Sequence, residues 1–252
     1  MRKLLFGLTF LSVGFLAACG AEESTTSTKV DDNETQTNTE QTEEVKAEAS
    51  IEVFQETYGV WTDSIDSVWV HYSAEVKNNG EEAASIGDIQ VNFEGADGSV
   101  LGTDTMLSAT PGIIQPGETA YITTSTTLDG YAETDFAKAS LNLDFDSVQE
   151  EAQLLKADAT KLVDLSADEY AYSPYKVTGT IINDSEEKSD DIRIASGLYD
   201  AEGKLLGVLE GSLQVSLNPE GKAGFELTYP ELPKDIGGKA TEVKVKAYNW
   251  TW

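Results

Sequence analysis

The chain has 252 residues, with 17 basic and 45 acidic side chains and a formal net charge of −28. This charge repels nucleic acid and anionic lipid surfaces over about one Debye length, roughly 8 Å at physiological salt, so we expect no nucleic-acid partner. The single cysteine excludes an intrachain disulfide, and the fold must therefore depend on its hydrophobic core. The length is sufficient for two domains of ordinary size.

The chain begins with the pattern of a secretory signal. Arg2 and Lys3 precede an apolar run, Leu4 to Phe15, that is too short for a comfortable transmembrane helix. The run ends in Leu16-Ala17-Ala18-Cys19-Gly20, which resembles the bacterial lipobox. The resemblance implies acylation of Cys19, for example with palmitate, and removal of residues 1–18 as a lipoprotein signal peptide. Two or three acyl chains would anchor the protein stably to the membrane. The alternative is an ordinary signal peptide with an unrelated cysteine.

Residues 19–50 are predicted to be the lipidated cysteine and a disordered acidic linker. From Ala21 to Ser50 there is no aromatic residue and no proline, and Val30 and Val45 are the only large apolar residues. Such a segment cannot bury enough apolar surface to offset the entropy of ordering. An anchor followed by a long polar spacer favours the extracytoplasmic face of the cell membrane, in a single-membrane (Gram-positive) envelope.

One stretch of the second half repeats a stretch found about 105 residues earlier. A shift of 105 places Val70 on Tyr175, Asn78 on Asn183 and Gly98 on Gly203, without a gap. The repeat predicts one β module used twice, over residues 51–148 and 149–252.

Alternating apolar and polar residues predict short strands in both modules. In the first module we expect them at 51–60, 68–77, 86–93, 100–107, 119–128 and 139–145. In the second we expect them at 175–182, 192–199, 205–209, 223–227 and 242–250. The strand at 68–77 alternates most clearly, which predicts a strand buried on one face only. Residues 148–161 fit either a short helix or a linker that runs into the first strand of the second module.

These patterns predict an all-β protein with two tandem immunoglobulin-like β-sandwich domains. The run Ser196-Gly197-Leu198-Tyr199-Asp200 resembles the FxLYD domain of bacterial lipoproteins and cell-envelope proteins, although Ser196 stands where that motif has phenylalanine. The resemblance implies a small β-sandwich outside the cell and carries over no catalytic residues. In such a domain Leu198 and Tyr199 would fill and edge the sandwich.

Residues that could support catalysis are scarce. A serine or cysteine nucleophile needs a base, and His71 is the only histidine, predicted here as an ordinary exposed side chain. We therefore predict a protein that is not an enzyme, with no cofactor and no metal site. Two alternatives stay open. One is a carboxylate-based envelope hydrolase, and the other is a calcium-stiffened adhesin, whose candidate ligands are Asp97 with Asp104, and Asp184 with Glu186, Asp190 and Asp191.

Aromatic residues on outer strand faces are the candidate contact residues. Tyr248, Trp250 and Trp252 share one face of the last strand, and Trp69 with His71 forms a second candidate group. Large aromatics on such a face often mark a contact surface. The contact is either with the first module or a loop, or with an envelope protein or glycan partner. The predicted function is a lipid-anchored cell-surface protein with a non-catalytic binding or structural role.

Overall fold

The computed structural model describes residues 48–250, which are almost entirely β structure. The first half contains seven strands: β1 (Ile51–Thr62), β2 (Val68–Asn78), β3 (Ala83–Gly95), β4 (Val100–Asp104), β5 (Ile113–Ile114), β6 (Thr119–Thr127) and β7 (Phe136–Val148). The second half contains six: β8 (Lys156–Asp164), β9 (Tyr175–Ile182), β10 (Ile192–Tyr199), β11 (Leu205–Leu213), β12 (Lys222–Leu227) and β13 (Glu242–Asn249). Two short 3-10 helices, η1 (Glu133–Asp135) and η2 (Lys234–Ile236), complete the described elements. The all-β prediction is confirmed.

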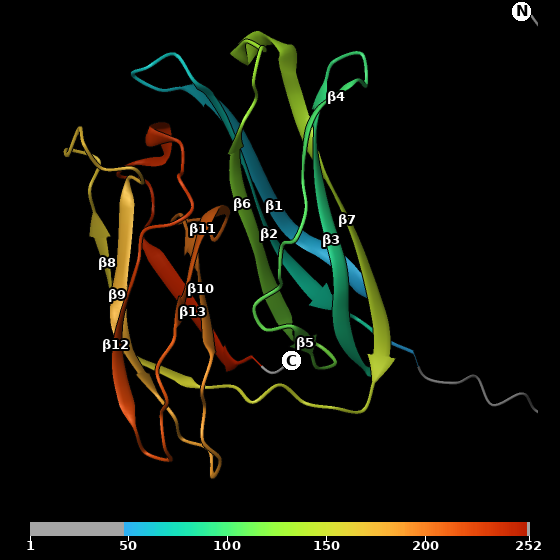
Figure 1. Cartoon of the computed structure of the whole chain (residues 1–252), viewed down its shortest axis with the longest axis vertical. Helices are drawn as coiled ribbons and strands as arrows, with labels where there is room; N and C mark the ends of the chain where they lie inside the picture. The colour runs from blue at the N-terminus through green and yellow to red at the C-terminus, as the bar shows by residue number, and fades with distance from the viewer. Residues whose placement is uncertain (1–47, 251–252) are drawn as a thin grey trace, which may run out of the picture. The chain divides into compact units, whose positions relative to one another are not determined.

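The strands form four antiparallel sheets with the same order in each half (Figure 1). Sheet A has the order β1-β2-β6, and sheet B places β4, β7 and the short β5 against β3. Sheet D has the order β8-β9-β12, and sheet C places β11 and β13 against β10. Sheets A and B enclose one hydrophobic core and sheets C and D a second. We call these pairs the N-terminal and C-terminal sandwiches, and their matching strand order agrees with the repeat seen in the sequence.

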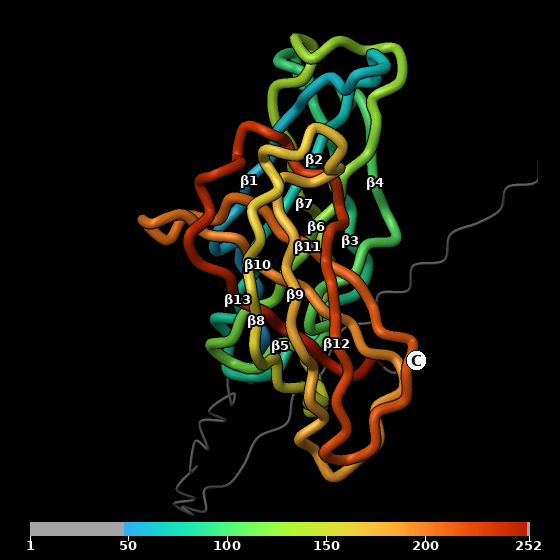
Figure 2. Tube along the Cα trace, turned by 90° about the vertical axis from the view of Figure 1, so that its left-hand side faces the viewer, coloured from blue at the N-terminus to red at the C-terminus, as the bar shows by residue number. Residues whose placement is uncertain are grey.

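Residues 156–164 are a strand, so the short helix was the wrong one of the two alternatives for 148–161, and the segment before Lys156 runs into this strand. Glu150, Glu151 and Leu154 favour helix by propensity. The strand β8 nevertheless pairs with β9, from Lys156 opposite Ile182 to Asp164 opposite Tyr175. Tertiary pairing outweighs local preference here, because β8 completes the edge of sheet D. Figure 2 looks onto this sheet.

A buried asparagine occupies the same position in each sandwich. Asn78 and Asn183 follow the central strands β2 and β9, and both are 0 % exposed. Each side-chain amide donates both of its hydrogens to backbone carbonyls of two loops. The acceptors are Glu82 (2.8 Å) and Ile114 (2.9 Å) for Asn78, and Glu187 (2.7 Å) and Leu217 (2.9 Å) for Asn183. These asparagines therefore fix the loops at one end of each sandwich.

Sheet A of the N-terminal sandwich packs against sheet C of the C-terminal sandwich. The apolar centre of this contact is a buried cluster of five residues: Tyr121, Ala195, Tyr199, Leu205 and Val208. Because the contact covers the outer face of sheet A, both faces of β2 are buried. The prediction that this strand is buried on one face only was wrong. In the FxLYD-like run, Leu198 lies in the sandwich core while Tyr199 lies in the contact.

The contact between sheets A and C is polar as well as apolar, and its polar groups are hydrogen-bonded. The Ser73 hydroxyl accepts a hydrogen bond from the backbone N–H of Val208 at 3.0 Å. The hydroxyls of Tyr121 and Tyr199 lie 2.8 Å apart, and the Tyr199 hydroxyl donates to Oε2 of Glu75 at 2.9 Å. Burial raises the pKa of Tyr199, so its hydroxyl stays protonated and remains a donor. Satisfied groups of this kind allow a serine- and threonine-rich face to be buried.

Ser196 occupies the core position where the FxLYD motif has phenylalanine. It is 0 % exposed, and its hydroxyl has no hydrogen-bond partner among the described residues. Ser196→Ala should therefore stabilise the protein by about 1 kcal/mol, because it removes a buried unsatisfied hydroxyl. Urea denaturation of both forms tests this. Ser73→Ala is the matched control, and it should destabilise because the Ser73 hydroxyl is bonded. A loss of stability in Ser196→Ala would contradict the assignment.

Candidate functional site

Trp69, the first of the predicted contact residues, has a structural environment. Its ring stacks on that of Trp61 from β1, with 6.1 Å between centroids and 13° between planes. Its Nε1 donates to Oδ2 of Asp63 at 3.0 Å, in the turn between β1 and β2. Trp69 thus holds this turn against the sheet and is only partly exposed.

His71 was predicted to be exposed, and this was wrong: it is 1 % exposed. The alternation along β2 correctly places His71 on the outer face of sheet A, but the C-terminal sandwich covers that face. Neither ring nitrogen has a hydrogen-bond partner among the described residues. Burial lowers the pKa of His71 to about 4, so the imidazole is neutral at pH 7. A ring so enclosed is not available to a partner at the described surface.

Tyr248 and Trp250 lie at the end of the last strand and have different surroundings. Tyr248 is 5 % exposed, and its hydroxyl donates to the backbone oxygen of Ala109 in the N-terminal sandwich at 3.4 Å. For Tyr248, the aromatic face of the last strand therefore contacts the first module, which is one of the two interpretations given in the sequence analysis. Trp250 is partly exposed, with the guanidinium carbon of Arg193 4.4 Å from its ring centroid. Cys19 and Trp252, the other predicted residues, lie outside the described residues, as do the predicted signal peptide and nearly all of the predicted linker.

Tyr248 and Trp250 line a hollow with a volume of about 920 Å³. We call it the C-terminal groove. Residues of the N-terminal sandwich form one side, among them Ile86 and Ile113, and the segment 151–153 that precedes β8 also borders it. The loop between β9 and β10 contributes four further lining residues: Glu187, Lys188, Asp190 and Asp191. The volume lies within the range of about 300–1,000 Å³ typical of ligand sites.

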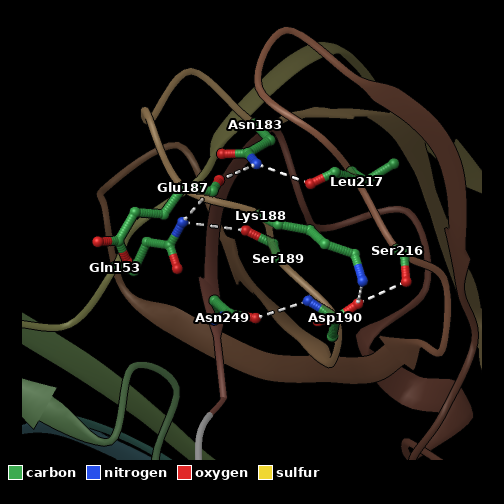
Figure 3. Close-up of polar contacts among 9 residues, drawn as sticks. All are labelled: Gln153, Asn183, Glu187, Lys188, Ser189, Asp190, Ser216, Leu217 and Asn249. Carbon is green, nitrogen blue, oxygen red and sulfur yellow. Dashed lines mark hydrogen bonds and ion pairs between the residues drawn. The ribbon is translucent and has the colours of Figure 1, made fainter.

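Hydrogen bonds fix the wall of the groove that the β9–β10 loop forms (Figure 3). The side-chain amide of Gln153 donates to Ser185 Oγ at 2.6 Å and to Ser189 Oγ at 3.2 Å. Oδ1 of Asn249, on β13, accepts from the backbone N–H of Asp190 at 3.0 Å. Together with Asn183, described above, these amides tie the loop to its neighbours, so the wall is pre-organised.

Two carboxylates of the groove are neutralised by neighbouring cations. Asp190 lies 2.7 Å from Lys188 Nζ, and this ammonium together with the Ser216 hydroxyl lowers the pKa of Asp190. Asp191 pairs with Arg193 through two contacts of 3.1 Å each. We regard Asp191 and Arg193 as a true ion pair, although the Nε to Oδ1 contact is too poorly aligned to be a hydrogen bond.

The acidic clusters proposed as calcium ligands are not assembled. Within residues 48–250 no group of three or more histidine, cysteine, aspartate or glutamate side chains is placed to hold a metal ion. Asp97 instead accepts from the backbone N–H and hydroxyl of Ser99 in its turn, and Asp104 accepts from the hydroxyl of Thr124. These carboxylates shape turns and strand contacts.

Comparison with models of protein families gives no match, and no curated protein matches the chain. The resemblance to the FxLYD domain therefore rests on residues 196–200 and the turns that follow. No helix between residues 48 and 250 has the length and apolar character needed to cross a membrane.

Proposed function

We propose that this chain is a lipid-anchored protein of the bacterial envelope that binds a partner through the C-terminal groove. Cys19, in its lipobox-like setting after an apolar run, would carry the anchor on the extracytoplasmic face. Residues 51–148 and 149–252 would be two domains, a division that the two separate cores support. The observation that carries the binding role is the groove itself, a hollow of about 920 Å³ between the sandwiches that contains Trp250.

We infer that the role is non-catalytic. His71 is buried, and neither of its ring nitrogens has a hydrogen-bond partner among the described residues. A general base must lie within hydrogen-bonding reach of the proton that it removes, so this environment does not suit one. Asp190 and Asp191 are paired with Lys188 and Arg193, so both carboxylates of this wall are already engaged by cations of the chain. A carboxylate-based hydrolase is the rival, and turnover of peptidoglycan or reporter glycosides by the purified protein would favour it.

Placement and binding are tested separately on intact cells. Labelled palmitate should enter the native protein and not Cys19→Ala, which should be released from the membrane. Retention of Cys19→Ala on the membrane would refute the anchor.

Proximity crosslinking tests the groove. Trp250→Ala should lose a crosslinked partner, whereas Tyr172→Ala should retain it. Tyr172 is the matched control because it is 80 % exposed and does not line the groove. Equal crosslinking by both variants, each with an unchanged circular dichroism spectrum, would refute binding at the groove.

A further inference from the structure

The negative charge that lines the C-terminal groove is only partly compensated. Asp190 and Asp191 have cationic partners, as described above. Glu151 and Glu187 also line the groove and are exposed, and neither carboxylate has an ion pair with another described residue. They come from different segments, Glu151 from the stretch before β8 and Glu187 from the β9–β10 loop. The groove therefore presents two unneutralised carboxylates in a chain whose net charge is already −28.

Two residues that line the groove, Trp250 and Asp191, contact one guanidinium group of the chain itself, that of Arg193. The Trp250 ring lies against this group, 4.4 Å from centroid to Cζ, and Asp191 pairs with the same guanidinium through both of its oxygens. An aromatic ring and a carboxylate are the two groups that recognise an arginine or lysine side chain most strongly. Trp250 and Asp191 are therefore occupied by Arg193, and Glu151 and Glu187 are the carboxylates of the groove that stay open to a basic side chain.

The unoccupied space is also suited to a chain segment. Its walls are held by Gln153 and Asn249, so little ordering is needed on binding. An anionic ligand would meet Glu151 and Glu187 directly, and like charges close together are strongly unfavourable. A basic ligand would instead be attracted from a distance by the acidic surface.

We propose that the C-terminal groove binds a lysine- or arginine-bearing segment of a partner protein. This proposal rests on the binding role assigned to the groove above and specifies the chemistry of its ligand. Glu151 and Glu187 pair with the basic side chains, while the segment containing Trp250 forms the adjoining wall.

The test uses a short fluorescent peptide in which lysine and serine alternate, added to the protein from Cys19 onward without its acyl groups. Fluorescence anisotropy should show binding that weakens as salt is raised. Glu151→Gln combined with Glu187→Gln should weaken binding at least about tenfold. The matched control is Glu133→Gln combined with Glu169→Gln, which removes the same charge from exposed positions that do not line the groove. This control should bind nearly as well as the native protein.

Three outcomes would overturn the proposal. The first is that the peptide fails to bind. The second is that both double variants weaken binding equally, which would indicate general attraction to an acidic surface. The third is binding of a neutral oligosaccharide, or of the same peptide with glutamate in place of lysine, in preference to the lysine peptide. If any of these occurs while Trp250→Ala still loses its crosslinked partner on cells, the groove remains the binding site and only the ligand class is rejected.

Discussion

Asn183→Leu should destabilise the protein by about 2–4 kcal/mol, one of the largest losses expected from a single substitution that leaves the apolar core intact. The side chain is 0 % exposed, and its amide donates to the carbonyls of Glu187 and Leu217. Leucine fills a similar volume but removes four hydrogen bonds, the two that the amide donates and the two that Asn183 Oδ1 accepts from the backbone N–H and hydroxyl of Ser185. Each lost hydrogen bond costs about 0.5–1.5 kcal/mol, and each of the two carbonyls keeps at least one other donor. The free energy of unfolding in urea measures the loss.

The repeat makes the same prediction for the other half. Asn78→Leu should cost a similar amount, because Asn78 makes the equivalent pair of hydrogen bonds. Hydrogen exchange should localise the first loss to the C-terminal sandwich and the second to the N-terminal one. Asn142→Leu, on the exposed surface of β7, is the control and should change stability by less than about 0.5 kcal/mol. If both buried variants behave like this control, the asparagines do not hold the loops.

The second large effect is a pH dependence that becomes visible only in variants. His71 has its pKa lowered from 6.5 to about 4 by burial, so the unfolded chain takes up this proton first as the pH falls. The stability that the neutral ring contributes is complete above about pH 6.5 and is lost as the pH falls towards 4. A difference of this size between the pKa values of the unfolded and folded states corresponds to about 3 kcal/mol of folding free energy.

Glu210, on β11, makes a contribution to stability that changes with pH in the opposite direction. Burial raises its pKa from 4.5 to about 7, and the nearby Arg193 offsets only part of this. The stability it contributes is complete below about pH 4.5 and is lost as the pH rises towards 7. The two contributions oppose each other over nearly the same range, so the native protein should have a nearly flat stability profile between about pH 4.5 and 6.5.

Single substitutions should separate these contributions. Glu210→Gln should lose stability on acidification from about pH 6.5 to 4, because Glu210 then no longer offsets the lowered pKa of His71. His71→Leu should gain stability over the same change. Melting temperatures measured across this range test both. Other ionisable groups in the sheet A–sheet C contact, namely Glu75, Glu231 and Lys246, are the same residues in all three forms. A flat profile for Glu210→Gln would show that His71 is not buried as a neutral ring.

Much of the fold could be predicted from local pattern, and the bounds of β9 and β10 agree with the expected ranges. The exception is β8, where helix-favouring residues precede the strand and only pairing with β9 decides the outcome. The matching asparagines were visible as a repeat, although their role in fixing the loops was not. Alternation and turn residues are local signals, and together with the duplication they were sufficient for the strands other than β8 and the two-residue β5.

The site could be predicted far less well. Alternation along β2 identifies an outer face, but it does not reveal that a second sheet covers that face, because hydroxyl-rich faces can be buried when they bond across a contact. His71 was misjudged for this reason. The groove combines Gln153, Asp190 and Asn249 with residues of the other sandwich, and their separation in sequence leaves no motif. Tyr248 and Trp250 were the parts of the groove that an outward-facing aromatic pattern could indicate.

The separation of the two cores has a consequence for how the protein is made. Residues 51–148 supply every strand of sheets A and B, so the first half can complete its core while the rest of the polypeptide is still being synthesised or exported. The outer face of sheet A would then be exposed to water until β10, β11 and β13 have folded. Serine and threonine hydroxyls can bond to water during that time, whereas an apolar face would be prone to aggregate. The late-arriving half docks onto a finished surface, so assembly order follows the direction of the chain.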